Sequence, residues 1–228
     1  MSLNIDKNVS VIIPVYNRRE KVLRALESVR SQTRFHDILE IFVIDDGSTD
    51  DTADIARNYD CTIIKNEISQ GPVKAKNVAL QFAKGDYIMF HDHDDIMEPD
   101  ILYELFRKLE ENTDVSAVMA KVRDFYSPDL SEEERTRTQI KKEPYYGLFT
   151  GAVLIRKSVF EKIGLFNESV TAGEIIDWQS KMYANHLKIK KLDFVATNRR
   201  IHSSNFGKTQ QKTEFKDYAA LLRAKLGK

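Results

Sequence analysis

The first hundred residues alternate between short apolar segments and amphipathic segments, and this alternation restricts the fold more than any other feature. The apolar segments have the nearly continuous β-branched and aromatic character of strands that are covered on both faces. They span residues 9–13, 40–44, 62–64 and 87–90. The segments between them carry apolar side chains at helical spacing, as at Val22, Leu26 and Val29. A repeated strand–helix–strand order predicts an α/β fold with a parallel sheet and right-handed crossovers.

Polar side chains follow each of these four predicted strands at the point where the strand ends. In strand order they are Tyr16 and Asn17, after the strand closed by Pro14, then Asp45 and Asp46, then Asn66, and finally Asp92 and Asp94. Ligands of parallel sheets bind outside the carboxyl ends of the strands. We therefore expect these side chains to line one crevice.

The fourth strand runs directly into the acidic stretch at residues 91–95, which contains three carboxylates and two imidazoles. Asp92 and Asp94 alternate, a pattern that suits a hard divalent cation whose shell is completed by phosphate oxygens and water. The alternative is a solvated loop in which Asp94 or Asp95 caps the next helix. Since three other strand ends point to the same crevice, we favour the metal site. His91 and His93 alternate away from the two carboxylates and are not expected to be ligands.

Composition limits the class of protein. The 228 residues are 42% hydrophobic, enough for the core of one α/β domain, and we expect a single domain over residues 1–228. Lys plus Arg and Asp plus Glu both number 35, which argues against a nucleic-acid binder. The single cysteine, Cys61, excludes a disulfide within this sequence and is expected to be a buried strand thiol. No signal peptide and no apolar run of 18 residues is present, so we expect a cytoplasmic protein.

The second half has a different character. We predict strands, an exposed charged excursion and helices, in the order strand 115–120, excursion 124–145, strand 149–156, helix 159–163, helix 172–183, strand 187–195 and terminal helix 215–226.

Several of these segments together resemble family 2 glycosyltransferases of the GT-A fold. The resemblance rests on residues 9–17, 43–50, 71–95 and 150–168, and covers about residues 8 to 180 in order. It implies a Rossmann-like α/β architecture, with a mostly parallel central sheet flanked by helices. Residues 8–112 would form the nucleotide-sugar-binding half, and residues 113–228 a mixed acceptor-side half.

The resemblance also implies roles. Tyr16 would stack on the nucleotide base, Asp46 would hydrogen-bond the base or ribose, and Asp94 with Asp92 would bind Mn²⁺ or Mg²⁺ bridging the diphosphate. Loop packing for Tyr16 and a turn or cap role for Asp46 are the alternatives. The predicted nucleotide-sugar site also includes Pro14, Asn17, Asp45, Asn66, Lys74 and Asn77. Lys74 and Lys76 either face phosphate or are solvated.

The expected general base is where this sequence departs from the family. Many members place an Asp directly after Glu at the start of a late helix, whereas this chain has Ile175 after Glu174. Glu174 and Asp177 are three residues apart on one helix face, so either could supply the base. Trp178, beside them, is expected to be a core residue.

Residues 199–205 resemble a tail found in some family members. His202 is a candidate third metal ligand, Arg199 or Arg200 a phosphate partner, and a satisfied loop histidine is the alternative for His202.

We therefore predict an inverting, metal-dependent enzyme that moves a sugar from a nucleotide-diphospho-sugar donor, most simply UDP-linked, to a hydroxyl of a carbohydrate or glycolipid acceptor. Its membrane contact would be at most peripheral, and surface-polysaccharide assembly is the family-level expectation. A non-catalytic nucleotide-sugar-binding homologue is the main alternative, because of Ile175. A sugar nucleotidyltransferase would need a glycine-rich basic loop after the first strand, which residues 17–20 do not provide.

Overall fold

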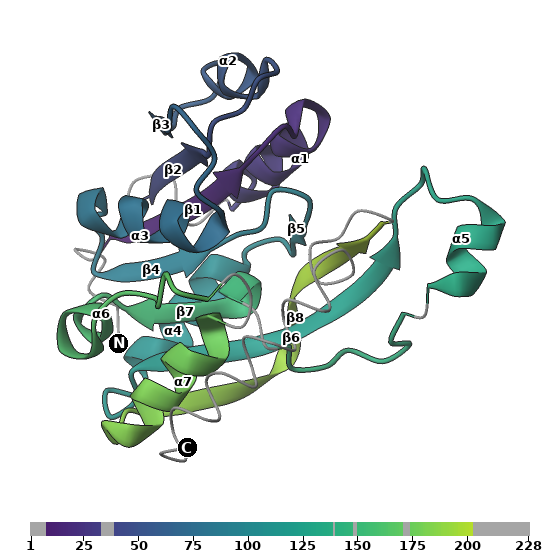
Figure 1. Ribbon diagram of the computed structural model, residues 1–228. Helices are drawn as coiled ribbons and strands as arrows, with labels where there is room; N and C mark the ends of the chain where they lie inside the picture. The colour runs from purple at the N-terminus through teal and green to yellow at the C-terminus, as the bar shows by residue number, and fades with distance from the viewer. Residues whose placement is uncertain (1–7, 33–38, 139, 148–149, 171–173, 203–228) are drawn as a thin grey trace, which may run out of the picture.

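The computed structural model describes residues 8–32, 39–138, 140–147, 150–170 and 174–202. It contains an eight-stranded sheet in the order β3-β2-β1-β4-β7-β6-β8-β5 (Figure 1). The strands are β1 (Val9–Val15), β2 (Leu39–Asp45), β3 (Thr62–Lys65), β4 (Tyr87–Phe90), β5 (Ile96–Met97), β6 (Ala117–Tyr126), β7 (Val153–Arg156) and β8 (Ile189–Ile201). The helices are α1 (Arg19–Arg30), α2 (Thr52–Ala56), α3 (Pro72–Phe82), α4 (Ile101–Glu110), α5 (Glu132–Arg137), α6 (Ser158–Ile163) and α7 (Glu174–Ala184), with a 3-10 turn at Thr150–Ala152.

The first four strands form the parallel half of the sheet, as the alternating pattern predicts. β1 lies between β2 and β4 and pairs in parallel with both. β7 then runs antiparallel to β4, and β6 antiparallel to β7, while β8 is parallel to β6. The second half is therefore mixed, also as predicted.

Helices cover both faces of the sheet, which explains why the strands are apolar on both sides. Val9, Val11 and Ile13 of β1 pack in a core cluster with α1, α2 and α4. Ile12 points to the other face, where α3, α6 and α7 pack. The crossovers from β1 to β2 and β3 thus use one face and the crossover to β4 uses the other, so the switch point of the sheet lies between β1 and β4. Trp178 is fully buried in the second cluster and stacks on Phe160 at 5.4 Å, which confirms its core role.

Several predicted boundaries in the second half are wrong. β6 continues to Tyr126 and β8 to Ile201, because the two strands pair with each other along a ladder that extends past residues 120 and 195. β7 begins at Val153 rather than at residue 149. The excursion contains α5, which is started by a capping box between Ser131 and Glu134 and projects away from the sheet (Figure 1). The predicted helix at 215–226 lies outside the described residues.

Two further expectations concern single features. Cys61 precedes β3 and is only half-buried, with its thiol donating to the carbonyl of Ala56 at 3.3 Å. Within the described part of the chain, no helix has the length and apolar character needed to cross a bilayer.

Candidate active site

The carboxyl ends of the parallel strands bring the predicted site residues together. Backbone hydrogen bonds continue between neighbouring chains just past the strand ends, from the Asp46 amide to the Val15 carbonyl, from the Asn66 amide to the Asp45 carbonyl, and from the His91 amide to the Ile12 carbonyl. Their lengths are 2.9, 2.8 and 2.9 Å. The loops after all four strands therefore leave the sheet side by side, as a crevice at this edge requires.

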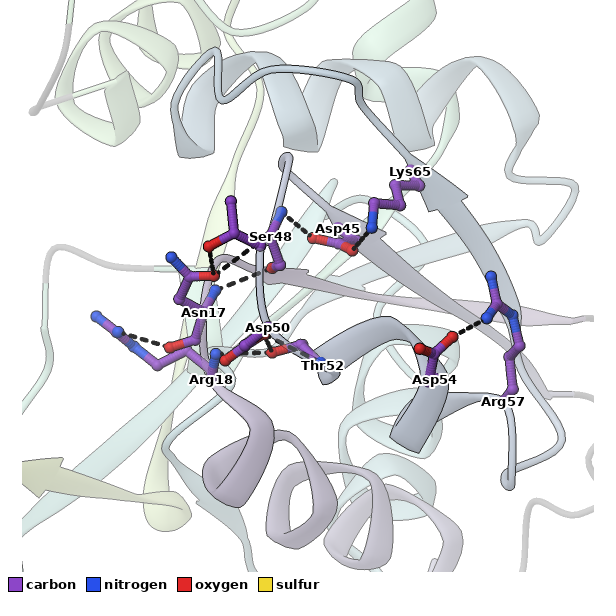
Figure 2. Close-up of polar contacts among 10 residues, drawn as sticks. Asn17, Arg18, Asp45, Ser48, Asp50, Thr52, Asp54, Arg57 and Lys65 are labelled. Atoms are coloured by element: carbon purple, nitrogen blue, oxygen red, sulfur yellow. Dashed lines mark hydrogen bonds and ion pairs between the residues drawn. The ribbon is translucent and has the colours of Figure 1, made fainter.

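Asn17 and Asp45 hold the loops after β1 and β2 against each other (Figure 2). Asn17 has a left-handed backbone (φ 51°), its amide donates to Ser48 Oγ at 2.9 Å, and its side-chain oxygen accepts from the Thr49 amide at 2.9 Å. Asp45 accepts from the Ser48 amide at 2.8 Å. Both polar side chains are engaged within the protein. Tyr16, directly before Asn17, is 45% exposed and offers a ring face to a ligand.

Asp46 fastens the loop that follows β3. Its buried carboxylate accepts hydrogen bonds from Asn66 Nδ2 (2.8 Å), Ser69 Oγ (2.7 Å) and the amides of Gln70 (3.0 Å) and Gly71 (2.8 Å). Gly71 precedes α3, so the same carboxylate lies at the amino end of that helix, where negative charge is favourable. Asn66 directly follows β3, and its side-chain amide donates to Asp46. No sequence signal identified the backbone donors of residues 70–71 as partners of this carboxylate.

Asp94 and His202 meet in the acidic stretch although they are far apart in the sequence. His202 Nε2 lies 2.6 Å from Asp94 Oδ2, and both side chains are largely buried. Burial alone raises the pKa of Asp94, but the hydrogen bond with His202 and the nearby His93 hold it well below its ordinary value. The structure thus places the predicted metal ligand Asp94 beside the third candidate, His202.

The pKa values of Asp92 and Asp95 are raised, in contrast to that of Asp94. Burial and the negative charges of Asp92 and Asp94 raise the pKa of Asp95, which accepts from the Arg200 amide at 2.9 Å. Burial also raises the pKa of Asp92, against the opposing effect of Lys76. Burial is the largest cause of both shifts, and the charge of Asp94 adds to it.

The two histidines of the acidic stretch have protein partners. His91 is fully buried, with Nε2 3.4 Å from Ser28 Oγ, and burial lowers its pKa to about 4. His93 Nε2 accepts from Arg18 Nε at 2.9 Å, and Nδ1 lies 3.3 Å from the Pro14 carbonyl, to which it donates in the matching tautomer. Pro14, a predicted nucleotide-sugar residue, thus contributes its carbonyl to the orientation of this ring.

The chemistry of the donors suits a divalent cation, but no three His, Cys, Asp or Glu side chains among the described residues are grouped so that they could hold one. Asp94 and His202 supply adjacent oxygen and nitrogen donors, a combination that suits Mn²⁺, and Asp92 supplies a further carboxylate. A cation bound there would favour the charged forms of Asp92 and Asp95 against the burial that raises their pKa values.

A buried ion pair joins α3, α7 and the acidic stretch. Lys76 Nζ lies 2.8 Å from Glu174 Oε1, and these side chains are only 8% and 15% exposed. The ammonium also lies over the rings of Phe90 and Phe166, at 5.7 and 5.9 Å. Burial lowers the pKa of Lys76, but Glu174 and Asp92 outweigh it and raise the pKa. For Glu174 the effects are reversed: burial raises its pKa, but Lys76 lowers the pKa below the ordinary value of a glutamate. Glu174 is therefore held as a carboxylate close to Asp92.

The other residues at the start of α7 point elsewhere. Ile175, at the family's usual base position, is 4% exposed and belongs to the apolar core. Asp177 is buried, with its carboxylate 3.0 Å from Lys181 Nζ one turn further along α7. Of the two candidate bases, the structure connects Glu174 with the acidic stretch.

Two predicted residues on α3 differ in their surroundings. Asn77 is buried, and its side chain bonds the Phe166 carbonyl and amide, both at 3.0 Å, and Glu168 at 2.9 Å. Its amide group thereby ties α3 to residues 166–168. Lys74 is half-exposed near the start of α3.

The sheet order and the crevice define the GT-A class of folds, and solved structures of that class superimpose on this chain. Staphylococcus aureus TarS 1–349 in complex with UDP-GlcNAc has a TM-score of 0.71 and 24% identity, over 87% of this chain and 60% of that protein. The mannosyltransferase PcManGT from Pyrobaculum calidifontis, in complex with GDP-Man and Mn²⁺, has a TM-score of 0.75 and 18% identity, over 97% of this chain and 65% of that protein. The predicted fold class is confirmed.

The chain belongs to the family described as Glycosyl transferase family 2, whose sequence model matches residues 10–164. The putative glycosyltransferase EpsH of Bacillus subtilis (strain 168) is 30% identical over 93% of this chain and 66% of its own length. The Escherichia coli protein named UDP-Glc:alpha-D-GlcNAc-diphosphoundecaprenol beta-1,3-glucosyltransferase WfaP is 46% identical over 38% of this chain and 35% of its own length. The chain thus spans less than two thirds of the length of these relatives.

Proposed function

We propose that this chain carries an inverting, metal-dependent glycosyltransferase that moves a sugar from a UDP-linked donor to a hydroxyl acceptor in polysaccharide or glycoconjugate assembly. The observation that carries the proposal is that exposed Tyr16, directly after β1, and the Asp94–His202 pair, after β4, follow the carboxyl ends of two neighbouring parallel strands. Family membership supports the reaction class. The UDP-GlcNAc complex of TarS and the name of WfaP support a UDP-sugar, and the diphosphoundecaprenol in that name supports a glycolipid acceptor.

Each residue of the crevice has a role in this proposal. Tyr16 stacks on the base, while Asp46 and Asn66 hold the loop beside it. Asp94, Asp92 and His202 would hold Mn²⁺ or Mg²⁺, which when bound neutralises charge on the nucleoside-diphosphate leaving group. The parallel half binds the donor, and the mixed half receives the acceptor.

Glu174 is the proposed general base. The acceptor oxygen attacks the anomeric carbon of the donor sugar, the bond from that carbon to the diphosphate oxygen breaks, and the hydroxyl proton passes to the carboxylate. A single displacement of this kind inverts the anomeric centre. The ion pair with Lys76 keeps Glu174 deprotonated, the state that a base requires, and the lowered pKa at the same time makes the carboxylate a weaker base.

A thermal-shift screen of UDP, GDP, CDP and dTDP, with and without Mn²⁺, tests the donor class. We expect UDP with Mn²⁺ to give the largest rise in Tm. A chain that no nucleotide stabilises would contradict the proposal, and a preference for GDP would redirect it to a different donor. With a turned-over donor, the anomeric configuration of the product, read by NMR, tests inversion.

The burial of Ile175 at the usual base position favours one other function, a non-catalytic nucleotide-sugar-binding protein. Slow hydrolysis of the donor distinguishes the two. Hydrolysis that disappears in the E174Q/D177N double variant supports the enzyme, whereas donor binding without any hydrolysis supports the binding protein. The cytoplasmic location and at most peripheral membrane contact expected from the sequence stay predictions.

A further inference from the structure

Arg18 and His93 connect the two sides of the switch point. Arg18 follows β1 and His93 follows β4, and Arg18 Nε donates to His93 Nε2 at 2.9 Å. The other ring nitrogen of His93 faces the Pro14 carbonyl, so both contacts of this ring go to the end of β1. His93 therefore fixes the acidic stretch to the loop that carries Tyr16.

The loop after β2 holds Arg18 from its backbone side. The Arg18 amide donates to Thr52 Oγ1 at 2.9 Å, and one terminal nitrogen, NH1, donates to the Asn17 carbonyl at 3.0 Å (Figure 2). Thr52 in turn donates to Asp50. An arginine whose backbone, Nε and NH1 are all bonded has lost most of its rotational freedom before any ligand arrives, which lowers the entropic cost of binding through the rest of the group.

The guanidinium keeps donors for a ligand. It carries five N–H groups in a planar fork. Nε and NH1 have the partners just described, and no hydrogen bond of NH2 to another described residue is found. Arg18 is half-buried, in contrast to its neighbour Arg19, whose side chain is 60% exposed and lies 3.4 Å from Asp51.

The position of this fork matches the charge distribution of the proposed donor. The backbone of Arg18 lies two residues after Tyr16, and its guanidinium contacts His93, the residue between Asp92 and Asp94. A nucleoside diphosphate that stacks on Tyr16 and reaches a cation at Asp94 places its phosphates in this interval. Arginine binds phosphate oxygens through paired, charge-assisted hydrogen bonds, more specifically than lysine.

We propose that Arg18, oriented by His93, binds the diphosphate of the donor and sets the spacing between the nucleoside loops and the metal-binding carboxylates. This inference rests on the proposed function and adds two residues to it. Arg18 contacts the donor, and His93 is a positioning residue that acts through Arg18.

Calorimetry with UDP and Mn²⁺, and ligand-observed NMR with uridine, test the inference on the full chain. R18M is expected to lower the affinity for UDP–Mn²⁺ by about tenfold to a hundredfold, the usual effect of losing hydrogen bonds to a charged group, and to leave uridine affinity within about twofold. R18K keeps the positive charge but not the planar fork of donors, and its affinity for UDP–Mn²⁺ should lie between those of R18M and the original chain. R19M removes the same charge one residue away and should bind UDP–Mn²⁺ like the original chain.

The role of His93 is tested by a double-mutant cycle. H93A should weaken UDP–Mn²⁺ binding by less than R18M does, and R18M should cost less in the H93A background than alone. Equal losses of UDP and uridine affinity in R18M would overturn the inference, since they indicate a general loosening of the loops. Strictly additive effects would overturn the positioning role of His93. A chain that binds no UDP–Mn²⁺ before any substitution would instead refute the proposed function itself.

Discussion

Replacing Lys76 by Met tests the buried ion pair most directly. The substitution removes the ammonium and leaves the Glu174 carboxylate in a site where it is only 15% exposed and close to Asp92. Breaking a buried pair by removing one partner typically costs about 3–5 kcal/mol. We expect a loss near 3 kcal/mol, because Glu174 can take up a proton, and this corresponds to a fall in Tm of about 6–12 °C for a chain of this size.

The loss of stability in K76M should depend on pH, and the pKa of Glu174 determines in which direction. In the original chain Lys76 lowers the pKa of Glu174, so the pair contributes stability above the ordinary glutamate pKa and loses it as the pH falls through the lowered value. In K76M the lowering effect of Lys76 is lost and burial, the largest effect, raises the pKa of Glu174, so the folded chain gains protons and stability as the pH falls. Urea unfolding should therefore show a larger K76M deficit at pH 8 than at pH 5.

Two further variants make the reasoning refutable. Adding E174Q to K76M removes both charges and should restore most of the lost free energy of unfolding. R156M breaks the Arg156–Glu110 pair beside Tyr87 at the amino end of β4, away from the crevice, and should lower stability without changing UDP affinity. If K76M unfolds like the original chain, or if E174Q restores nothing, the pair does not hold Glu174 as described.

Three other substitutions test the crevice. Asp94→Asn should abolish the Mn²⁺-dependent part of UDP binding in calorimetry, and an unchanged UDP–Mn²⁺ affinity would remove Asp94 from the metal site. Tyr16→Ala should cost about 1–3 kcal/mol of uridine affinity by loss of stacking, whereas Tyr183→Ala, at an 86% exposed position, should change nothing. Gly47→Ala combines a positive φ of 82° with a Cβ that would lie 2.7 Å from the Ser69 amide nitrogen, so it should destabilise the fold and weaken UDP binding together. Melting curves and UDP titration of that variant measure both effects, and a loss of stability with full UDP affinity would show that the loop held by Asp46 does not line the nucleotide site.

The parallel half of the fold could be predicted because its information is local. Each strand is a contiguous apolar run, each crossover is short, and handedness leaves few arrangements. The ladder between β6 and β8 could not be read in this way. Its outer part contains Lys121 and Arg123, paired with residues more than 70 positions later, and polar residues in a half-exposed ladder look like a loop when the partner strand is unknown.

The site was predictable to the extent that it follows strand ends. The sequence predicts Asp94 and His202 as separate candidate metal ligands, but their contact depends on how β8 is placed. The pair of Lys76 with Glu174 joins residues 98 apart, and only the packing of α7 against α3 brings them together. Nothing in the chemistry of Asp46 distinguishes a carboxylate that faces a nucleotide base from one that organises a neighbouring loop.

The late position of β8 in the sequence implies an order in which the parts of the site fold. Arg200 and His202 bond Asp95 and Asp94 across 105 and 108 residues, whereas Tyr16, Asp46 and Asn66 precede all four of these residues and leave the ribosome before them. Contacts of such long sequence separation form late, and synthesis favours folding from the amino end. The loops that carry Tyr16, Asp46 and Asn66 therefore form before Asp94 acquires its histidine partner, so under the proposed function a growing chain gains its nucleoside-binding loops before its metal ligands are complete.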